Sequence, residues 1–105
     1  MMNVFIVEDH PLFIAGIRTL FDEEEDITIS GEAGDGRMAI EKIRQQVPDV
    51  VIMDIKMPDM DGLVTITKLK EIFPDLKTVL LTGYGSEKVK QATESLGSVY
   101  IEKNC

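Results

Sequence analysis

Acidic, hydroxyl and basic side chains follow short apolar runs at several points along the chain. Glu8 and Asp9 come directly after one apolar run, and Asp54 follows another. Thr82 and Lys103 follow two later runs. If these runs are strands of one parallel sheet, their carboxyl ends share an edge. Three carboxylates, a hydroxyl and an ammonium group would then converge there.

Such a group of side chains is suited to phosphoryl transfer. Neighbouring carboxylates repel one another unless a cation joins them, and their oxygens suit a hard divalent ion such as Mg²⁺, or Mn²⁺ in its place. A lysine and a hydroxyl can neutralise phosphoryl oxygens, since positioning and charge stabilisation supply most of the catalysis. Asp54 stands alone at the end of a central run, so we predict that it is the nucleophile and forms an aspartyl-phosphate.

The apolar pattern predicts five strands that alternate with four helices. Continuous apolar runs are typical of buried parallel strands, and apolar residues three or four apart indicate helices. Each connection is long enough for a crossover, so the predicted fold is α/β with a doubly wound parallel sheet. The predicted strands are residues 3–7, 27–33 at an edge, 50–53, 78–81 and 98–101.

Proline and glycine indicate where several of the predicted helices begin or end. The first begins at Pro11, which suits a first helical turn, and carries an apolar stripe of Phe13, Ile17, Leu20 and Phe21. The second follows a turn and cap at residues 34–36 and is predicted to reach Val47, before Pro48. The third carries Leu63, Ile66, Leu69 and Ile72, and the fourth covers residues 86–95.

Length and composition set further bounds. The 105 residues suit one domain, with 44% hydrophobic and 29% charged residues as in a globular protein. The net charge of -8 argues against binding of nucleic acid or of an anionic membrane through a basic surface. The single cysteine, Cys105, excludes an internal disulfide and a cysteine-based zinc site. Short apolar runs and an early acidic pair predict neither a membrane span nor a signal peptide, so we expect a cytoplasmic protein.

Four segments together resemble the receiver domains of two-component response regulators. They are Glu8-Asp9, the sequence DIKMPDMDG from Asp54 to Gly62, Leu81-Thr82-Gly83, and Tyr100-Ile101-Glu102-Lys103. The resemblance covers the whole chain. The segment EDHPLFIAGIRTLF is most similar to receivers attached to helix-turn-helix output domains of the NarL/LuxR type. The resemblance implies a flavodoxin-like sheet with strand order 2-1-3-4-5.

The resemblance also implies the chemistry of the site. Asp54 would accept a phosphoryl group from a sensor histidine kinase. Asp9 would bind Mg²⁺ directly and Glu8 mostly through water, and the backbone carbonyl of Lys56 would be the third protein ligand. Lys103 would pair with Asp54 at rest and with the phosphoryl group afterwards.

A switch would follow phosphorylation in such a domain. Thr82 would move to bind a phosphoryl oxygen, and Tyr100 would turn inward into the space that Thr82 left, which links the site to the surface of the fourth helix and fifth strand. Lys56 and Tyr84 correspond to variable positions that tune the lifetime of the phosphoryl group. Two plainer interpretations remain open, an ordinary strand-end Thr82 and a half-buried Tyr100 that does not move.

Two features depart from the receiver pattern. The segment between Thr82 and Lys103 is one residue shorter than in a typical member, and Leu96-Gly97-Ser98-Val99 replaces the usual turn that ends in glycine. The chain also stops two residues past Lys103. We therefore expect residues 1–105 to form one receiver domain without the fifth helix and without an output domain. Apolar side chains of the third to fifth strands should be exposed, which predicts a homodimer, a domain swap or loose packing in that region.

The resulting prediction is a signalling domain that catalyses only its own phosphorylation and dephosphorylation. In the full protein it would control a DNA-binding output domain, without contacting nucleic acid or a membrane itself. One alternative is a receiver-like interaction module that is never phosphorylated. Another is a small-molecule phosphatase with an aspartyl nucleophile, but such enzymes generally carry a second aspartate two residues later, where this chain has Lys56.

Overall fold

The structure is a computed structural model that describes residues 2–54, 62–82 and 87–102. Strands and helices alternate along this part of the chain, as the apolar pattern predicts. The strands are β1 (Met2–Val7), β2 (Ile27–Ala33), β3 (Val50–Asp54), β4 (Lys77–Thr82) and β5 (Val99–Glu102). The helices are α1 (Pro11–Asp22), α2 (Gly36–Gln45), α3 (Gly62–Ile72) and α4 (Glu87–Ser95). None of the helices in the described ranges is long and apolar enough to cross a membrane.

The five strands form one parallel sheet in the order β2-β1-β3-β4-β5. This order confirms the expectation drawn from the resemblance, and it places β2 at an edge as the alternating sequence of residues 27–33 predicts. The chain starts in β1, crosses to β2 and then returns past β1 to β3. In open α/β sheets, ligands bind beyond the carboxyl ends of the strands, at the place where the strand order reverses in this way.

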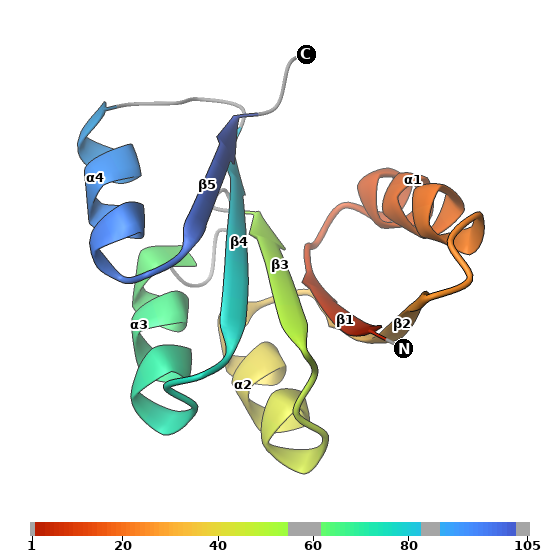
Figure 1. Ribbon diagram of the computed structural model, residues 1–105, viewed down its shortest axis with the longest axis horizontal. Coiled ribbons are helices and arrows are strands. Elements are labelled where there is room, and N and C mark those ends of the chain that lie inside the picture. The colour runs from red at the N-terminus through yellow and green to blue at the C-terminus, as the bar shows by residue number, and fades with distance from the viewer. Residues whose placement is uncertain (1, 55–61, 83–86, 103–105) are drawn as a thin grey trace.

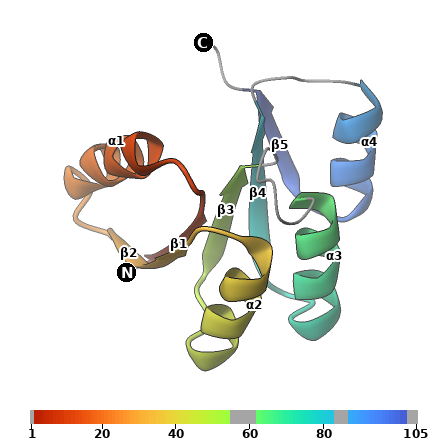
Figure 2. The same cartoon turned by 180° about the vertical axis from the view of Figure 1, so that it is seen from behind.

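The two faces of the sheet are covered unequally (Figures 1 and 2). Helices α2 and α3 pack on one face, and α1 lies on the other face over β1 and β2. The main core lies on the side of α2 and α3. Its buried members are Phe5, Val7, Ala33, Ala39, Ile43, Val51, Met53, Ile66, Leu69, Leu76 and Leu80.

The opposite face is less well covered beyond β1. Val4 and Ile6 alternate with the core residues of β1, so they face the side of α1, and both are buried. Further along this face, Ile52 of β3 and Val79 of β4 are only half-buried. Ile101 of β5 is 45% exposed. The predicted exposure of apolar side chains is therefore confirmed for β5 and is partial for β3 and β4.

A β-bulge in β2 sets the register between the two N-terminal strands. Val4 pairs with Ile29 and Phe5 with Gly31, so Ser30 is the extra residue. The Ser30 hydroxyl donates a hydrogen bond of 3.4 Å to the carbonyl of Val4. At Gly31 an added Cβ would lie 3.0 Å from Cε2 of Phe5, so a side chain at this position would require the Phe5 ring or β2 to shift by a few tenths of an ångström.

For α1 and α2 the predicted helix starts agree with the structure, whereas the predicted end of α2 does not. Pro11 begins α1, and the Asp35 carboxylate accepts a 2.8 Å hydrogen bond from the Met38 N–H, which caps α2. The predicted end of α2 at Val47 is wrong, because the helix stops at Gln45. Gln46 already adopts an extended conformation (φ -148°, ψ 100°). The helical conformation is also disfavoured for Val47, because Val47 directly precedes Pro48.

Fewer of the apolar residues on the helices are buried than the helical spacing suggests. On α1 only Ile17 is buried, and Leu20 is 69% exposed. On α3, Ile66 and Leu69 are fully buried, whereas Ile72 in the last turn is exposed. Helical spacing assigns residues to a side of the helix, but it does not show how much of that side the neighbouring element covers.

Candidate functional site

The carboxyl ends of the strands meet at one edge of the sheet. Val7 is the partner of Met53 in the register of β1 and β3, so the chain continues into Glu8 beside the position of Asp54. Asp54 is the last residue of β3 and pairs with Leu81, and Thr82 is the last residue of β4. The backbone thus brings Glu8, Asp54 and Thr82 to neighbouring positions.

Glu8 and Asp9 are adjacent in sequence but differ in environment. Glu8 is 2% exposed, and its N–H donates a 2.9 Å hydrogen bond to the carbonyl of Ala33 at the end of β2. Its Oε1 accepts a 3.1 Å hydrogen bond from the N–H of His10. Asp9 is exposed. The pair therefore presents one restrained, buried carboxylate and one that solvent can reach.

A cleft of about 320 Å³ opens beside this acidic pair. Glu8 and Asp9 line one side of it, and Ile14 of α1 contributes to its wall. Gly34 and Lys42 line the side toward α2. The cleft gives a small solvated ligand access to the loop that follows β1.

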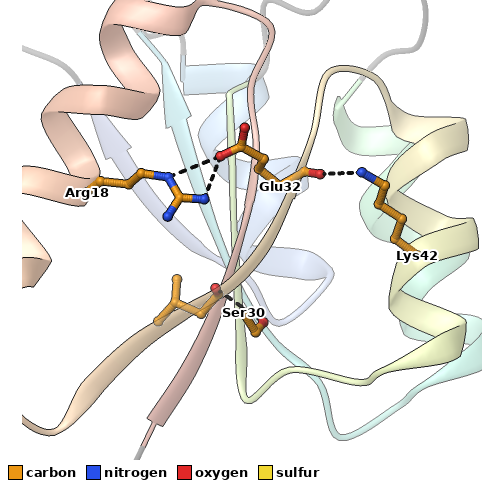
Figure 3. Close-up of polar contacts among 5 residues, drawn as sticks. Arg18, Ser30, Glu32 and Lys42 are labelled. Atoms are coloured by element: carbon orange, nitrogen blue, oxygen red, sulfur yellow. Dashed lines mark hydrogen bonds and ion pairs between the residues drawn. The ribbon is translucent and has the colours of Figure 1, made fainter.

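Polar contacts from two helices hold the end of β2 next to this cleft (Figure 3). Arg18 of α1 donates from Nη2 to Oε2 of Glu32 at 2.7 Å and from Nε to the same oxygen at 3.2 Å. Lys42 of α2 donates from Nζ to the carbonyl of Glu32 at 3.0 Å. Because Ala33 follows Glu32 and binds Glu8, these contacts support the acidic pair indirectly.

Sequence reasoning missed the contacts of Arg18, Glu32 and Lys42. The spacing of charged residues predicts which side of a helix or strand is polar, but it does not pair residues on different elements. The one available signal is the position of Glu32, which lies one residue before the end of a predicted edge strand.

The structure describes less of the other predicted site residues. For Asp54 and Thr82 the described part is the backbone. Tyr100 lies on β5 opposite Leu80 and is half-buried. Lys56, Tyr84 and Lys103 lie outside the described residues.

The acidic residues fit a hard divalent cation by their chemistry. Glu8 and Asp9 supply carboxylate oxygens, which are the ligands that Mg²⁺ prefers, at the edge where the backbone of Asp54 also ends. Within the described residues no group of three His, Cys, Asp or Glu side chains could by itself hold a metal ion. A complete site would need a third oxygen ligand in addition to this pair.

A protein-family model described as the response regulator receiver domain matches residues 4–105. The transcriptional regulatory protein YhcZ of Bacillus subtilis is 38% identical over 87 residues, which cover 83% of this chain and 41% of YhcZ. The response regulator protein VraR of Staphylococcus epidermidis is 37% identical over 103 residues, covering 97% of this chain and 49% of VraR. The chain spans about half the length of the curated relatives it matches. These relatives are response regulators of the NarL/LuxR type.

A solved structure shows the same arrangement of elements. The isolated receiver domain of RcsB from Salmonella enterica serovar Typhimurium, in the presence of the phosphomimetic BeF₃⁻, superposes with a TM-score of 0.88 at 31% sequence identity. The superposition covers 95% of this chain and 75% of the RcsB domain.

Proposed function

Because the chain belongs to the family of response regulator receiver domains, we propose that it is a phosphorylation-controlled switch with Asp54 as the phosphoacceptor. Receiver domains are signalling domains and not classical enzymes. The observation that carries the proposal is the meeting of Glu8, Asp9 and the end of β3 at one edge of the sheet. A nucleophile at the end of a strand and a metal-binding acidic pair beside it are the parts that phosphoryl transfer needs.

In the proposed reaction, a carboxylate oxygen of Asp54 attacks the phosphorus of a phosphohistidine on a sensor kinase. The new O–P bond forms as the bond from phosphorus to the imidazole nitrogen breaks, and the electron pair leaves with that nitrogen. Lys103 pairs with the Asp54 carboxylate before transfer and with the phosphoryl group after it. Hydrolysis by water later returns Asp54 to its free carboxylate and releases phosphate.

Receiver domains generally bind Mg²⁺. When bound, Mg²⁺ or Mn²⁺ would neutralise charge on the phosphoryl oxygens. Asp9 is exposed and is assigned to direct ligation, and buried Glu8, held by Ala33 and His10, is assigned to ligation through water. The backbone carbonyl of Lys56 is the proposed third protein ligand.

The proposed response joins the site to the surface of α4 and β5. Thr82 binds a phosphoryl oxygen, and Tyr100 then turns inward beside β4. The half-buried position of Tyr100 opposite Leu80 supports this proposal, because a side chain there has both a solvent side and an interior side. Lys56 and Tyr84 are proposed to tune how long the phosphoryl group survives.

The proposed partners follow from the relatives. YhcZ is a transcriptional regulatory protein, and the relatives are of the NarL/LuxR type, so we assign a DNA-binding output domain to the full protein and a sensor histidine kinase as the donor. This domain itself carries a net charge of -8, which disfavours direct binding to nucleic acid or an anionic membrane. Response regulators are generally cytoplasmic, and we propose the same compartment here.

Phosphorylation is tested with acetyl phosphate, Mg²⁺ and intact-protein mass spectrometry. Wild-type protein should gain the mass of one phosphoryl group, and Asp54→Asn should gain none. Asp75→Asn is the matched control, because Asp75 is an exposed acid in the turn before β4, and this variant should be modified like wild type. No adduct on wild type would favour an interaction module that is never phosphorylated. Release of phosphate from sugar phosphates would favour the phosphatase.

A further inference from the structure

The C-terminal end of α4 is tied to the sheet by hydrogen bonds. Gly97 adopts a positive φ of 77°, and its N–H donates to the carbonyl of Glu94 at 3.0 Å. The N–H of Ser98 donates to the carbonyl of Thr93 at 3.2 Å. These two bonds form a Schellman motif, in which the residue after the glycine closes the helix. Ser98 is therefore both the last residue of the helix cap and the residue before β5.

Ser98 continues this connection into β4 through its side chain. Its hydroxyl donates to the carbonyl of Thr78 at 3.2 Å, and the hydroxyls of Ser98 and Thr78 are also hydrogen-bonded to each other. With the Ser98 hydrogen directed to the carbonyl, the Thr78 hydroxyl is the donor in the second bond, so each hydroxyl hydrogen has an acceptor. Both residues are buried.

Thr93 is the residue of α4 whose carbonyl accepts the hydrogen bond from the Ser98 N–H. It is fully buried, and it occupies the helix position whose side chain commonly makes an apolar contact with the residue after the glycine in a Schellman motif. Here both positions carry hydroxyls. We call the hydrogen-bonded pair Thr78 and Ser98 the hydroxyl clamp. Hydrogen bonds are directional, so buried and satisfied hydroxyls favour one arrangement, whereas apolar side chains can slide.

The clamp lies at only one end of α4. The helix runs opposite to the strands, so Glu87 lies toward the edge where β4 ends and Ser95 lies near the start of β5 (Figure 1). The edge near Glu87 is the one that carries Asp54 and Thr82. A change at the site thus reaches α4 at the end that is distant from the clamp.

We propose that the hydroxyl clamp is a pivot that confines the response of α4 to its N-terminal end. Thr78 and Ser98 are positioning residues in this proposal. They keep β5 in register with β4, with Tyr100 two residues beyond Ser98, while the first turn of α4 changes its position. The proposal rests on the proposed function, since it presumes that phosphorylation at Asp54 acts on α4.

Amide hydrogen exchange measured by NMR, with and without BeF₃⁻ and Mg²⁺, tests the pivot. In wild type, BeF₃⁻ should change exchange in the first turn of α4 and leave Gly97 and Ser98 nearly unchanged. In Ser98→Ala, loss of the hydrogen bonds should speed exchange of the Gly97 and Ser98 amides by about tenfold at rest. The effect of BeF₃⁻ should then extend to these two amides.

Matched variants separate the clamp from general loosening of the helix. Ser95→Ala removes an exposed hydroxyl that bonds to the carbonyl of Gln91 on the same helix, and it should behave like wild type at Gly97 and Ser98. Thr78→Val removes the hydroxyl that β4 contributes to the clamp and nearly keeps the shape of the side chain. It should therefore reproduce the faster amide exchange of Ser98→Ala. Thr78→Ser keeps the hydroxyl and should restore the wild-type pattern.

Two results would overturn the pivot while leaving the proposed function intact. One is a BeF₃⁻ response at Gly97 and Ser98 of wild type as large as that in the first turn of α4. The other is equal behaviour of Ser98→Ala and Ser95→Ala. Absence of a ¹⁹F resonance of bound BeF₃⁻ in wild type would instead remove the proposed function and the pivot together, so the two failures are distinguishable.

Discussion

At the scale of single residues, Glu8 and Asp9 show how one backbone step separates two carboxylates with different surroundings. Glu8 is buried and bonded to the loop, and Asp9 faces solvent. Binding of a cation to the exposed member needs little rearrangement of the fold. Substitution of Asp9 should therefore act on metal binding with little effect on the stability of the metal-free protein.

Mg²⁺ is expected to stabilise the protein through this pair. At a Mg²⁺ concentration tenfold above the dissociation constant, the free energy of unfolding should rise by about 1.4 kcal/mol, because a ligand that binds only the folded state stabilises it. Asp9→Asn should lose this increment. Urea unfolding with and without Mg²⁺ measures it, and an equal increment in both proteins would contradict the assignment of Asp9 as a ligand.

A side chain at Gly31 is expected to force a small shift of the Phe5 ring or of β2. Gly31→Ala would place a Cβ 3.0 Å from the Phe5 ring, which is buried in the core, and should lower the free energy of unfolding by about 1–3 kcal/mol. Gly34→Ala is the control, since its Cβ would meet nothing within 4 Å. Urea unfolding of the two variants gives the comparison, and equal stabilities would show that β2 shifts to relieve the contact.

At the scale of elements, α1 buries fewer side chains against the sheet than α2 or α3 does. Only Ile17 is buried, and the ion pair of Arg18 with Glu32 is nearly half exposed at both side chains. Exposed ion pairs of this kind contribute about 0–1 kcal/mol. The intrinsic helix preference of its residues should therefore matter more for α1 than for α2 or α3.

Gly16→Ala should stabilise the protein. Gly16 lies in the middle of α1, and an added Cβ would meet nothing within 4 Å. Alanine is favoured over glycine in a helix interior by about 0.5–1 kcal/mol. Thermal unfolding followed by far-UV circular dichroism should show a higher midpoint for Gly16→Ala, and a lower midpoint would mean that the helix needs the small residue for a contact.

Most element positions could be predicted because each depends on local pattern. The four apolar residues before Asp54 predict a strand that ends there, and Pro11 predicts a helix start. Packing between elements is not local, so the exposure of Leu20 and the bonds of Glu32 could not be predicted. Alternation of strands and helices does not specify strand order either, which came from the resemblance. The chemical roles of all the predicted site residues, from Glu8 and Asp54 to Lys103, remain predictions.

At the scale of the whole molecule, the face of the sheet opposite α3 exposes apolar side chains. Val99 and Ile101 of β5 are 56% and 45% exposed, and Ile52, Val79 and Leu81 are half-buried on the same face. Contiguous apolar surface of this kind favours association. We therefore propose that the protein forms a homodimer or exchanges elements between copies through this face.

Sedimentation velocity over a range of concentrations tests the association. Wild type should show a dimer that grows with concentration, and Ile101→Lys should remain monomeric, because a lysine on an edge strand opposes pairing and burial. Val64→Lys is the control, since Val64 is also 45% exposed but lies on α3, on the other side of the sheet. A compact monomer of wild type at all concentrations would contradict the proposal.

The pairing of β1 with β3 has a consequence for the order in which the protein folds. The chain must close its longest loop to form this pair, because all of β2 and α2 lies between the two strands, whereas β3–β4 and β4–β5 each enclose a single helix. Loop closure over a longer segment carries a larger entropic penalty, so we expect this pairing late in folding. It is also the pairing that brings Glu8 beside Asp54. A complete chain that refolds from the denatured state would thus acquire its acidic site in one of the last steps of folding, when the central strands join.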